Sequence, residues 1–482
     1  MSAPSSALDW QRRAAAGEFT YSAGIALTLE ALRRVQAADS PLTEILEASA
    51  REAASAADRR RADGVPARPL EGVPITIKDN IATVEGTTTA ASAILDGYSA
   101  PEDATVVARL REAGAIVVAK TNCDEFAMGA STETSARGPT RNPWDPTRVP
   151  GGSSGGAAVV AATVEGGIHV GSDTGGSVRQ PAALCGVSGF KPTYGSVSRA
   201  GLIAFASSLD QVGFLARSAT DLRAAWEVVA GRDPRDPATE AIDAPSPSSG
   251  EPRVIGLLRE WTGDDVAPAV RERVSEAARS FEELGFEVRE ISVPLLPIAN
   301  ACYHVISAAE AASNLARYDG VRCGAERGTR TLGEHRSAGF GREVQRRLVM
   351  GAFVTSTGQR DRYYARAVEV RRALAAQVRS AWSEVDLLLA PTTPTTAFRL
   401  GENLDDPIAM YAGDRAAVAA NLLGLPALSL PAGRDAGGLP VGVQLVAPRH
   451  GDRALFHCAE RFQSATTYHL ESPSGASREE SA

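Results

Sequence analysis

Helical and extended segments alternate along this chain, and that alternation constrains its fold more than any other feature. Residues 105–113 place apolar side chains at helical spacing, Gly114 ends the pattern, and residues 115–119 form the continuous apolar run of a buried strand. The same order recurs where residues 266–284 precede the extended segment 287–291. Such alternation predicts an α/β fold in which helices pack against a mixed sheet.

Other segments extend this pattern. Residues 24–60 are rich in Ala, Leu, Glu and Arg at helical spacing, which predicts one or two helices. Residues 233–252 are rich in Pro, Asp and Ser, which predicts a surface loop. Further buried strands are expected at residues 73–77, 386–390, 427–430 and 441–446.

Composition excludes several classes of protein. Apolar residues make up 44% of the 482 residues and charged residues 22%, as is typical of a globular protein in water. No apolar run approaches the roughly 18 residues of a membrane helix, and the start of the chain does not resemble a signal peptide. Five scattered cysteines without metal-ligand spacing indicate a reduced, cytoplasmic protein with no metal site. The net charge of −8 argues against a basic surface that binds nucleic acid by itself.

A first unusual run consists of six small residues, Gly151-Gly152-Ser153-Ser154-Gly155-Gly156. Small residues let backbone amides approach a bound group closely, but a flexible loop before the helix expected at 157–164 explains the run equally well. Ser153 also fits the Gly-x-Ser-x-Gly nucleophile elbow, although residues 148–150 make a poor preceding strand. A phosphate-binding loop does not fit, because no Gly-Lys-Ser/Thr follows.

A second run follows the apolar segment 167–170 and reads Gly171-Ser172-Asp173-Thr174-Gly175-Gly176-Ser177-Val178-Arg179-Gln180-Pro181. Consecutive amides from Thr174 to Ser177 can form a concave nest for a negatively charged oxygen. Ser177 stands at the end of that nest, where an attacking hydroxyl would lie. Taken alone, a tight turn packed with Gly and Ser is an equally good interpretation.

A lysine ends the apolar segment 73–77. A lone lysine is usually a solvated surface charge, but Lys78 follows directly on an apolar strand. Burial at that position would disfavour the charged form and lower its pKa. A neutral lysine can accept a proton, so Lys78 is a candidate base.

Taken together, the three stretches resemble the amidase signature family. That family has a Gly-Gly-Ser-Ser-Gly-Gly run and then a second serine in Gly-Gly-Ser-Val/Ile-Arg-x-Pro; here Ser153 and Ser177 are 24 residues apart, as in the family. Its upstream lysine lies in a Pro-x-x-x-Lys-Asp context, which Pro74, Lys78 and Asp79 match. The resemblance implies the amidase-signature fold, a central mixed sheet covered by helices on both faces.

The resemblance also implies catalytic roles. Ser177 would be the nucleophile, Ser153 a bridging serine carried on a cis peptide bond, and Lys78 the base. Neutral Lys78 would take a proton through Ser153 from Ser177, which attacks the amide carbonyl. No histidine or metal is needed for this reaction. The oxyanion would be held by the backbone amides near Thr174, Gly175 and Gly176.

The same resemblance implies one main domain. Residues 66–470 would form the amidase-signature domain, and residues 1–65 an N-terminal helical segment of that same domain. Residues 471–482 are polar and lack apolar periodicity, which predicts a disordered tail.

Further motifs narrow the resemblance to the glutamine-hydrolysing subunits of Glu-tRNA(Gln)/Asp-tRNA(Asn) amidotransferases, over about residues 69–465. Those subunits release ammonia from glutamine, so the resemblance implies that activity here. The motifs are residues 124–129, 138–144, 205–211, 313–320, 339–341 and 391–394.

Recognition of free glutamine requires groups for an α-carboxylate and an α-ammonium. The family's amino-acid-binding positions map onto Tyr303, Arg347 and Asp414. Arg347 would bind the α-carboxylate through a bidentate pair of hydrogen bonds, Asp414 would pair with the α-ammonium, and Tyr303 would hydrogen-bond the ligand. Taken singly, each is more often a surface ion-pair member or a core tyrosine.

The implied partners are amidotransferase subunits B and C in a heterotrimer, with tRNA held mainly by the partner and no membrane contact. This chain would need no cofactor, and ATP and Mg²⁺ would be used by the partner. Two alternatives stay open: a stand-alone amidase for another small carboxamide, and an inactive scaffold. Departures from the family pattern occur in the first 65 residues and at His304, Cys323 and Gln359-Arg360.

Overall fold

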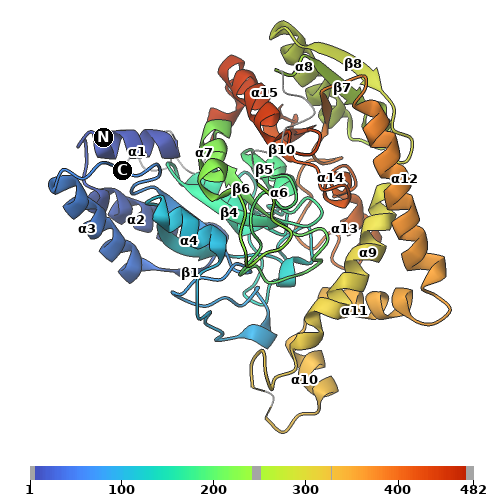
Figure 1. Cartoon of the computed structure of the whole chain (residues 1–482), viewed down its shortest axis with the longest axis horizontal. Helices are drawn as coiled ribbons and strands as arrows, with labels where there is room; N and C mark the ends of the chain where they lie inside the picture. The colour runs from blue at the N-terminus through green and yellow to red at the C-terminus, as the bar shows by residue number, and fades with distance from the viewer. Residues whose placement is uncertain (1–5, 242–250, 327, 474–482) are drawn as a thin grey trace.

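A single mixed sheet of eleven strands runs through the computed structural model, which describes residues 6–241, 251–326 and 328–473 (Figure 1). The strands follow the order β1-β3-β2-β4-β6-β5-β10-β11-β9-β7-β8 across the sheet. Their bounds are β1 Leu42–Ile45, β2 Pro74–Lys78, β3 Ile116–Thr121, β4 Ile168–Asp173, β5 Ser188–Lys191, β6 Gln211–Ala216, β7 Val254–Leu258, β8 Glu287–Ile291, β9 Leu387–Pro391, β10 Ala427–Arg434 and β11 Pro440–Val446.

Fifteen α-helices surround this sheet in the described part of the chain. Figure 1 shows α1 to α3 gathered at one end of the molecule, with α9, α11 and α12 at the other and α10 projecting beyond them. The helices are α1 Ala7–Ala15, α2 Tyr21–Asp39, α3 Glu47–Ala62, α4 Thr105–Glu112, α5 Gly155–Thr163, α6 Arg179–Cys185, α7 Ala219–Val229, α8 Pro268–Glu283, α9 Ala299–Asn314, α10 Leu332–Gly339, α11 Arg342–Thr355, α12 Arg366–Ala381, α13 Pro407–Ala412, α14 Val418–Leu422 and α15 Asp452–Ala465.

The strand directions confirm the predicted mixed sheet. β2 runs parallel to both of its neighbours, β3 and β4, whereas β4 runs antiparallel to β6. In the β2–β4 pair, Ile77 lies opposite Val170. Because parallel strands end at the same edge, this register brings Lys78 at the end of β2 close to the turn that follows Asp173 at the end of β4.

Helices cover both faces of the sheet, as the resemblance implied. Successive side chains of a strand point to opposite faces. In β6, Phe214 packs into a cluster with Trp226 of α7, while Leu215 packs into a separate cluster with Val159 of α5. Both side chains are fully buried, so neither face is open to solvent at this strand.

The N-terminal segment contains a strand that sequence analysis did not predict. Two helices, α2 and α3, occupy the region 24–60 as expected, but β1 lies between them and pairs antiparallel with β3. Four residues are too few to show a period of two against the helical pattern on either side. Through β1 the segment 1–65 extends the same sheet; its assignment to one domain with residues 66–470 stays a proposal.

Several predicted boundaries shift by a few residues. The helix expected from residue 266 begins at Pro268, because proline lacks the N–H that a helix interior needs and suits the first position. Of the loop expected at 233–252, residues 242–250 lie outside the described residues. Its start is anchored, because the Asp233 carboxylate accepts hydrogen bonds from Thr105 at 2.6 Å and Ser198 at 2.5 Å. Most of the tail predicted at 471–482 lies outside the described residues.

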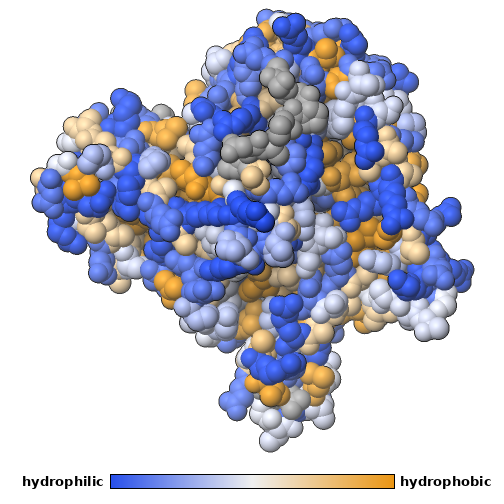
Figure 2. All heavy atoms as spheres, viewed as in Figure 1, coloured by the Kyte–Doolittle hydropathy of each residue, from blue (hydrophilic) through white to orange (hydrophobic). Residues whose placement is uncertain are grey.

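Hydrophilic side chains cover most of the face shown in Figure 2, with smaller hydrophobic areas between them. Among the described residues, no helix is both long enough and apolar enough to cross a membrane.

Candidate active site

The two runs of glycine and serine converge beside the end of β2. The backbone N–H of Ser154 donates to the carbonyl oxygen of Ser177 at 3.0 Å, which joins the runs directly. The peptide bond between Gly152 and Ser153 is cis. The structure therefore brings Lys78 and both candidate serines, which are far apart in sequence, to one edge of the sheet.

Three serine hydroxyls surround the amine of Lys78. Its Nζ lies 2.8 Å from Ser153 Oγ, 2.9 Å from Ser154 Oγ and 3.0 Å from Ser172 Oγ. Asn80 donates a hydrogen bond to Ser172 Oγ at 2.9 Å and so orients that hydroxyl. Lys78 and Ser153 are both fully buried, which makes their contact a direct path for a proton that bulk water does not interrupt.

Burial changes the acidity of Lys78. Removal from water lowers the pKa of Lys78 to about 8, although the carboxylates of Asp124 and Asp173 favour the charged form. A lysine with this pKa is partly neutral near neutral pH and can accept a proton. His169, by contrast, contacts Thr76 at 3.0 Å, and burial lowers the pKa of His169 to about 3, which makes it a weak base.

The backbone that carries Ser153 is held from both sides. The N–H of Gly152 donates to Gln180 Oε1 at 2.8 Å, and the carbonyl oxygen of Ser153 accepts from the N–H of Asp124 at 3.3 Å. A Cβ added to Gly152 would lie 2.1 Å from Asp124 Oδ2, so only glycine fits there. The neighbours therefore fix the direction of the Ser153 hydroxyl.

Asp173 organises the turn that leads to Ser177. Its carboxylate accepts hydrogen bonds from the N–H of Gly176 at 2.8 Å and of Val178 at 3.1 Å, and it pairs with the buried Arg179. Burial alone would raise the pKa of Asp173, but Arg179 holds it well below its usual range. The N–H of Gly176 thus points at Asp173 and not at a bound oxygen, contrary to the predicted oxyanion role. The turn's remaining amides belong to Thr174, Gly175 and Ser177.

Exposure distinguishes the two candidate serines. Ser177 keeps 7% of its surface exposed, whereas Ser153 and Lys78 are fully buried. A ligand that enters from solvent can therefore reach Ser177 before the other two. This order of access matches a relay in which the outermost hydroxyl attacks the substrate.

Two of the predicted amino-acid-binding residues border the same turn. A Cβ added to Gly175 would lie 2.7 Å from Tyr303 Oη, and one added to Gly176 would lie 3.7 Å from Asp414 Oδ1. Within the described residues, Asp414 Oδ1 is buried without a hydrogen-bond partner, and burial raises the pKa of Asp414 well above its usual range. A buried carboxylate in this condition would be stabilised by a cationic ligand.

Arg347 lies on α11 near Tyr303 and Asp414: burial raises the pKa of both groups, and the charge of Arg347 opposes that rise. The region between these three side chains is called the amino-acid hollow.

Arg347 Nε donates to Glu343 Oε1 at 2.7 Å, its Nη1 lies 3.2 Å from His304 Nδ1, and its guanidinium lies 4.5 Å from the centre of the Tyr411 ring. Burial would lower the pKa of Arg347, but Tyr411 and Glu343 hold it above the ordinary value. Arg347 is thus a fixed cation that is almost completely buried.

His304, which departs from the family pattern, belongs to this group. Its ring stacks on Tyr411 with centroids 4.0 Å apart. Burial and the neighbouring Arg347 lower the pKa of His304 well below its usual value, so the neutral ring can accept a hydrogen bond from Arg347. The other departures lie outside this group: Cys323 is exposed, and Gln359-Arg360 lead into a π-helical turn at Asp361–Ala365.

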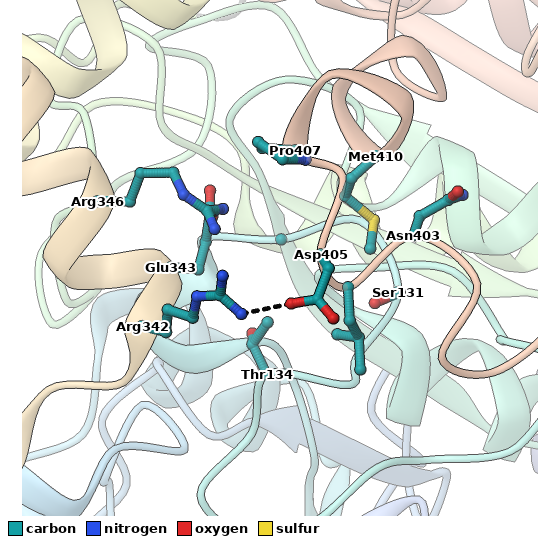
Figure 3. Close-up of a pocket in the computed structure, with 11 residues that line it drawn as sticks. Ser131, Thr134, Arg342, Glu343, Arg346, Asn403, Asp405, Pro407 and Met410 are labelled. Carbon is teal, nitrogen blue, oxygen red and sulfur yellow. Dashed lines mark hydrogen bonds and ion pairs between the residues drawn. The ribbon is translucent and has the colours of Figure 1, made fainter.

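A pocket of about 310 Å³ adjoins the site (Figure 3). Glu343 connects the two, because it lines the pocket and also holds Arg347. In Figure 3, Arg342 of α11 points toward Asp405, from the segment before α13, and the two side chains are 2.5 Å apart. The lining residues are Gly129, Ser131, Thr134, Arg342, Glu343, Arg346, Asn403, Leu404, Asp405, Pro407 and Met410.

Sequence analysis missed several residues of the site. Ser154 and Ser172 lie in the two conspicuous runs, but nothing in the sequence shows that they face Lys78. Glu343 had a usable signal, because it precedes Arg347 by four residues on a helix, a spacing at which side chains of opposite charge meet. For His304, the sequence contains no signal except that this residue departs from the family pattern.

The family model described as Amidase matches residues 26–456. The chain belongs to the amidase family. The A subunit of glutamyl-tRNA(Gln) amidotransferase from Rhodopirellula baltica is 46% identical over 478 residues, which cover 95% of each chain. The match confirms the family that the three stretches around Lys78, Ser153 and Ser177 indicated.

Solved structures of the amidase family share this fold. The A subunit of glutamyl-tRNA(Gln) amidotransferase from Thermotoga maritima is 39% identical, with a TM-score of 0.76 and 93% of each chain covered. The peptide amidase of Stenotrophomonas maltophilia is 30% identical, with a TM-score of 0.80 and 96% of each chain covered. Amidotransferase A subunits and peptide amidases therefore share this fold. The chain is more similar in sequence to the amidotransferase subunit, at 39% identity, than to the peptide amidase, at 30%.

Proposed function

We propose that this chain is the glutamine-hydrolysing A subunit of a tRNA-dependent amidotransferase, which releases ammonia for the amidation of Glu-tRNA(Gln), Asp-tRNA(Asn) or both. The observation that carries the amidase chemistry is the 2.8 Å contact between the buried Lys78 amine and Ser153 Oγ. The similarity to an amidotransferase A subunit, at 46% identity over nearly the whole chain, supports this class over a stand-alone amidase.

The proposed reaction begins with proton transfer. Neutral Lys78 accepts the Ser153 hydroxyl proton while Ser153 takes the proton of Ser177, whose Oγ attacks the side-chain amide carbonyl of glutamine. The oxygen of the tetrahedral intermediate accepts hydrogen bonds from backbone amides of the turn at Thr174 and Gly175. The proton returns along the same path to the leaving nitrogen, ammonia departs, and water hydrolyses the glutamyl ester of Ser177.

Glutamine recognition would use the charges of the adjoining hollow. Arg347 would bind the α-carboxylate, because its guanidinium is a permanent cation held by Glu343. Asp414 would bind the α-ammonium, which would pair its buried oxygen and favour the ionised carboxylate. Tyr303, next to Gly175, would hydrogen-bond the ligand beside the reacting carbonyl.

The proposed assembly has further subunits. Subunits B and C would complete a heterotrimer in the cytoplasm, and the tRNA would be held mainly by a partner. ATP and Mg²⁺ would act in that partner, where the tRNA-bound carboxylate is activated, and this chain would contribute no cofactor of its own. The ammonia formed at Ser177 would be consumed there.

Substrate selection provides the test. We expect Arg347→Ala and Asp414→Ala each to raise KM for glutamine by about tenfold or more, because each leaves one charged group of the bound amino acid without its partner. A simple amide without α-amino and α-carboxyl groups should be hydrolysed as by the parent protein. Arg366→Ala and Glu369→Ala, which remove an exposed ion pair on α12, are matched controls and should change neither substrate.

The outcomes separate the possible functions. Equal losses on both substrates would mean that Arg347 and Asp414 support the fold and do not recognise the amino acid. Efficient turnover of the simple amide, with little activity on glutamine in the presence of the B and C subunits, would favour a stand-alone amidase. Absence of hydrolysis of either amide would favour an inactive scaffold.

A further inference from the structure

One motif noted in the sequence, residues 205–211, is not used by the proposed reaction, yet it supplies a buried carboxylate next to the site. Asp210 precedes β6 and is only 3% exposed. Its two oxygens accept hydrogen bonds from two separate parts of the chain. A buried carboxylate is costly unless it is fully hydrogen-bonded, so these contacts define what Asp210 holds in place.

The first contact is with the oxyanion turn. Thr174 Oγ1 donates to Asp210 Oδ1 at 2.7 Å, and both side chains are buried. Thr174 opens the turn that ends at Ser177, and its backbone amide is one of those proposed to hold the oxyanion. A hydrogen bond to its side chain limits rotation of the peptide groups on either side. Asp210 thus restrains the entry to the turn, while Asp173 restrains its centre.

The second contact is with the backbone of Phe205 and Ala206, beside Arg347. The N–H groups of Phe205 and Ala206 donate to the Asp210 carboxylate at 2.9 to 3.1 Å. The ring of Phe205 lies 5.9 Å from the guanidinium of Arg347. A shift of Asp210 would therefore reach the residue proposed to bind the α-carboxylate as well as the oxyanion turn.

We propose that Asp210 is a positioning residue that fixes the oxyanion turn and the Arg347 side of the amino-acid hollow relative to each other. This inference rests on the proposed function. One carboxylate accepts from both parts, so the distance between the reacting carbonyl and the α-carboxylate of a bound amino acid is held by a single rigid group. An asparagine at this position would have one oxygen that accepts hydrogen bonds and one NH₂ group that donates them. It could therefore contact both Thr174 and the Phe205–Ala206 backbone only if the direction of one of these hydrogen bonds were reversed.

The test separates the two contacts. Thr174→Val removes only the hydroxyl, and we expect kcat for glutamine to fall about tenfold while KM changes less than about twofold, because the turn loosens but the hollow does not. Thr174→Ser keeps the hydroxyl and should restore kcat to within about threefold of the parent. Asp210→Asn disturbs both contacts and should lower kcat and also raise KM about threefold or more.

The chain offers a matched control. Thr193 donates to Asp452 at 2.5 Å in a pair of the same kind that is equally buried but belongs to another part of the fold. Thr193→Val should lower the melting temperature about as much as Thr174→Val, and it should leave kcat unchanged. Addition of Asp210→Asn to Thr174→Val should cost less kcat than the two separate losses together predict.

Clear results would overturn the inference. If Thr174→Val keeps the parent kcat, or if Thr174→Ser fails to restore it, the hydrogen bond to Asp210 does not position the turn. If Asp210→Asn does not fold, the two Thr174 variants still decide the question. A simple amide distinguishes this failure from failure of the proposed function, because loosening of the turn should lower kcat for that amide even if glutamine is not the substrate.

Discussion

Two buried lysines on neighbouring strands show what makes one of them a candidate base. Lys78 ends β2, and Lys120 lies on β3 opposite Ile77. Both are fully buried, and burial lowers the pKa of each to about 8. Acidity therefore does not distinguish them.

The hydrogen-bond partners of Lys78 and Lys120 distinguish the two lysines. Lys78 faces three serine hydroxyls, among them Ser153, in the run that is bonded directly to the partly exposed Ser177. Lys120 faces the carbonyl oxygen of Ile81 at 2.6 Å, with two threonine hydroxyls, and so holds together the segment that follows β2. The comparison teaches that a lowered pKa makes a lysine available as a base, and that connection to a hydroxyl within reach of substrate gives it a reaction.

The largest expected effect comes from removal of the reachable hydroxyl. Ser177→Ala should abolish formation of the acyl-enzyme, because no other group is proposed to attack the carbonyl. Thr88→Val, which removes a hydroxyl beside Lys120, should leave it intact. Acid quenching during turnover followed by intact-mass measurement would detect the glutamyl adduct, and its presence in the Ser177→Ala protein would contradict the assignment.

The same substitution at each lysine sharpens the contrast. Lys78→Met should lower kcat by about 10²–10⁴, the usual contribution of a general base. Lys78→Arg should not restore activity, because arginine stays protonated. Lys120→Met should keep kcat within about threefold of the parent. Steady-state glutaminase assays would decide, and similar losses at both positions would remove the distinction.

The pH dependence should follow Lys78 alone. Because the base must be neutral, kcat/KM for glutamine should fall as pH drops below about 8, by up to about tenfold per unit. Lys120→Met should keep this acid limb unchanged, although Lys120 has a pKa near the same value. Profiles between pH 6 and 8.5 would test this, and loss of the limb in Lys120→Met would show that the limb reports Lys120 instead of Lys78.

The smallest expected effect concerns stability. Lys120→Met leaves the Ile81 carbonyl oxygen and the two threonine hydroxyls without their donor, so the free energy of unfolding should fall by about 1–3 kcal/mol. Urea denaturation at pH 7 would measure this change. A variant as stable as the parent would show that Lys120 does not brace the segment after β2.

The proposed catalytic residues could be found in the sequence because their signals are local. Asp124 packs against Gly152 and Tyr303 packs against Gly175 so closely that no larger residue fits at either position. The glycines near the two serines are therefore required, and they form runs that can be recognised in the sequence alone. The helices α2 to α5 and α8, and the strands β2, β3 and β8 to β11 apart from the boundaries, were predictable for a similar reason, since burial on one or both faces leaves its period in the sequence. β1 was not predicted, because an edge strand of only four residues is too short to show a recognisable period in the sequence.

Contacts between distant segments were beyond sequence analysis. The sequence does not show that Gly176 turns its N–H toward Asp173, and Asp210 carried no sign that it meets Thr174. Such contacts depend on the relative position of separate strands and turns. That position is set by packing of the whole sheet.

The sequence by itself determined the amidase family, the α/β class and the identity of the candidate serines and lysine, because each is encoded within a few neighbouring residues. Only the tertiary structure decided which of two equally buried lysines faces Ser153, and that Arg347 of α11 lies 3.2 Å from the ring of His304 on α9. The physical reason is that protons move and charges pair over a few ångströms in space, and those distances exist only once β2, β4 and α11 have packed into one molecule.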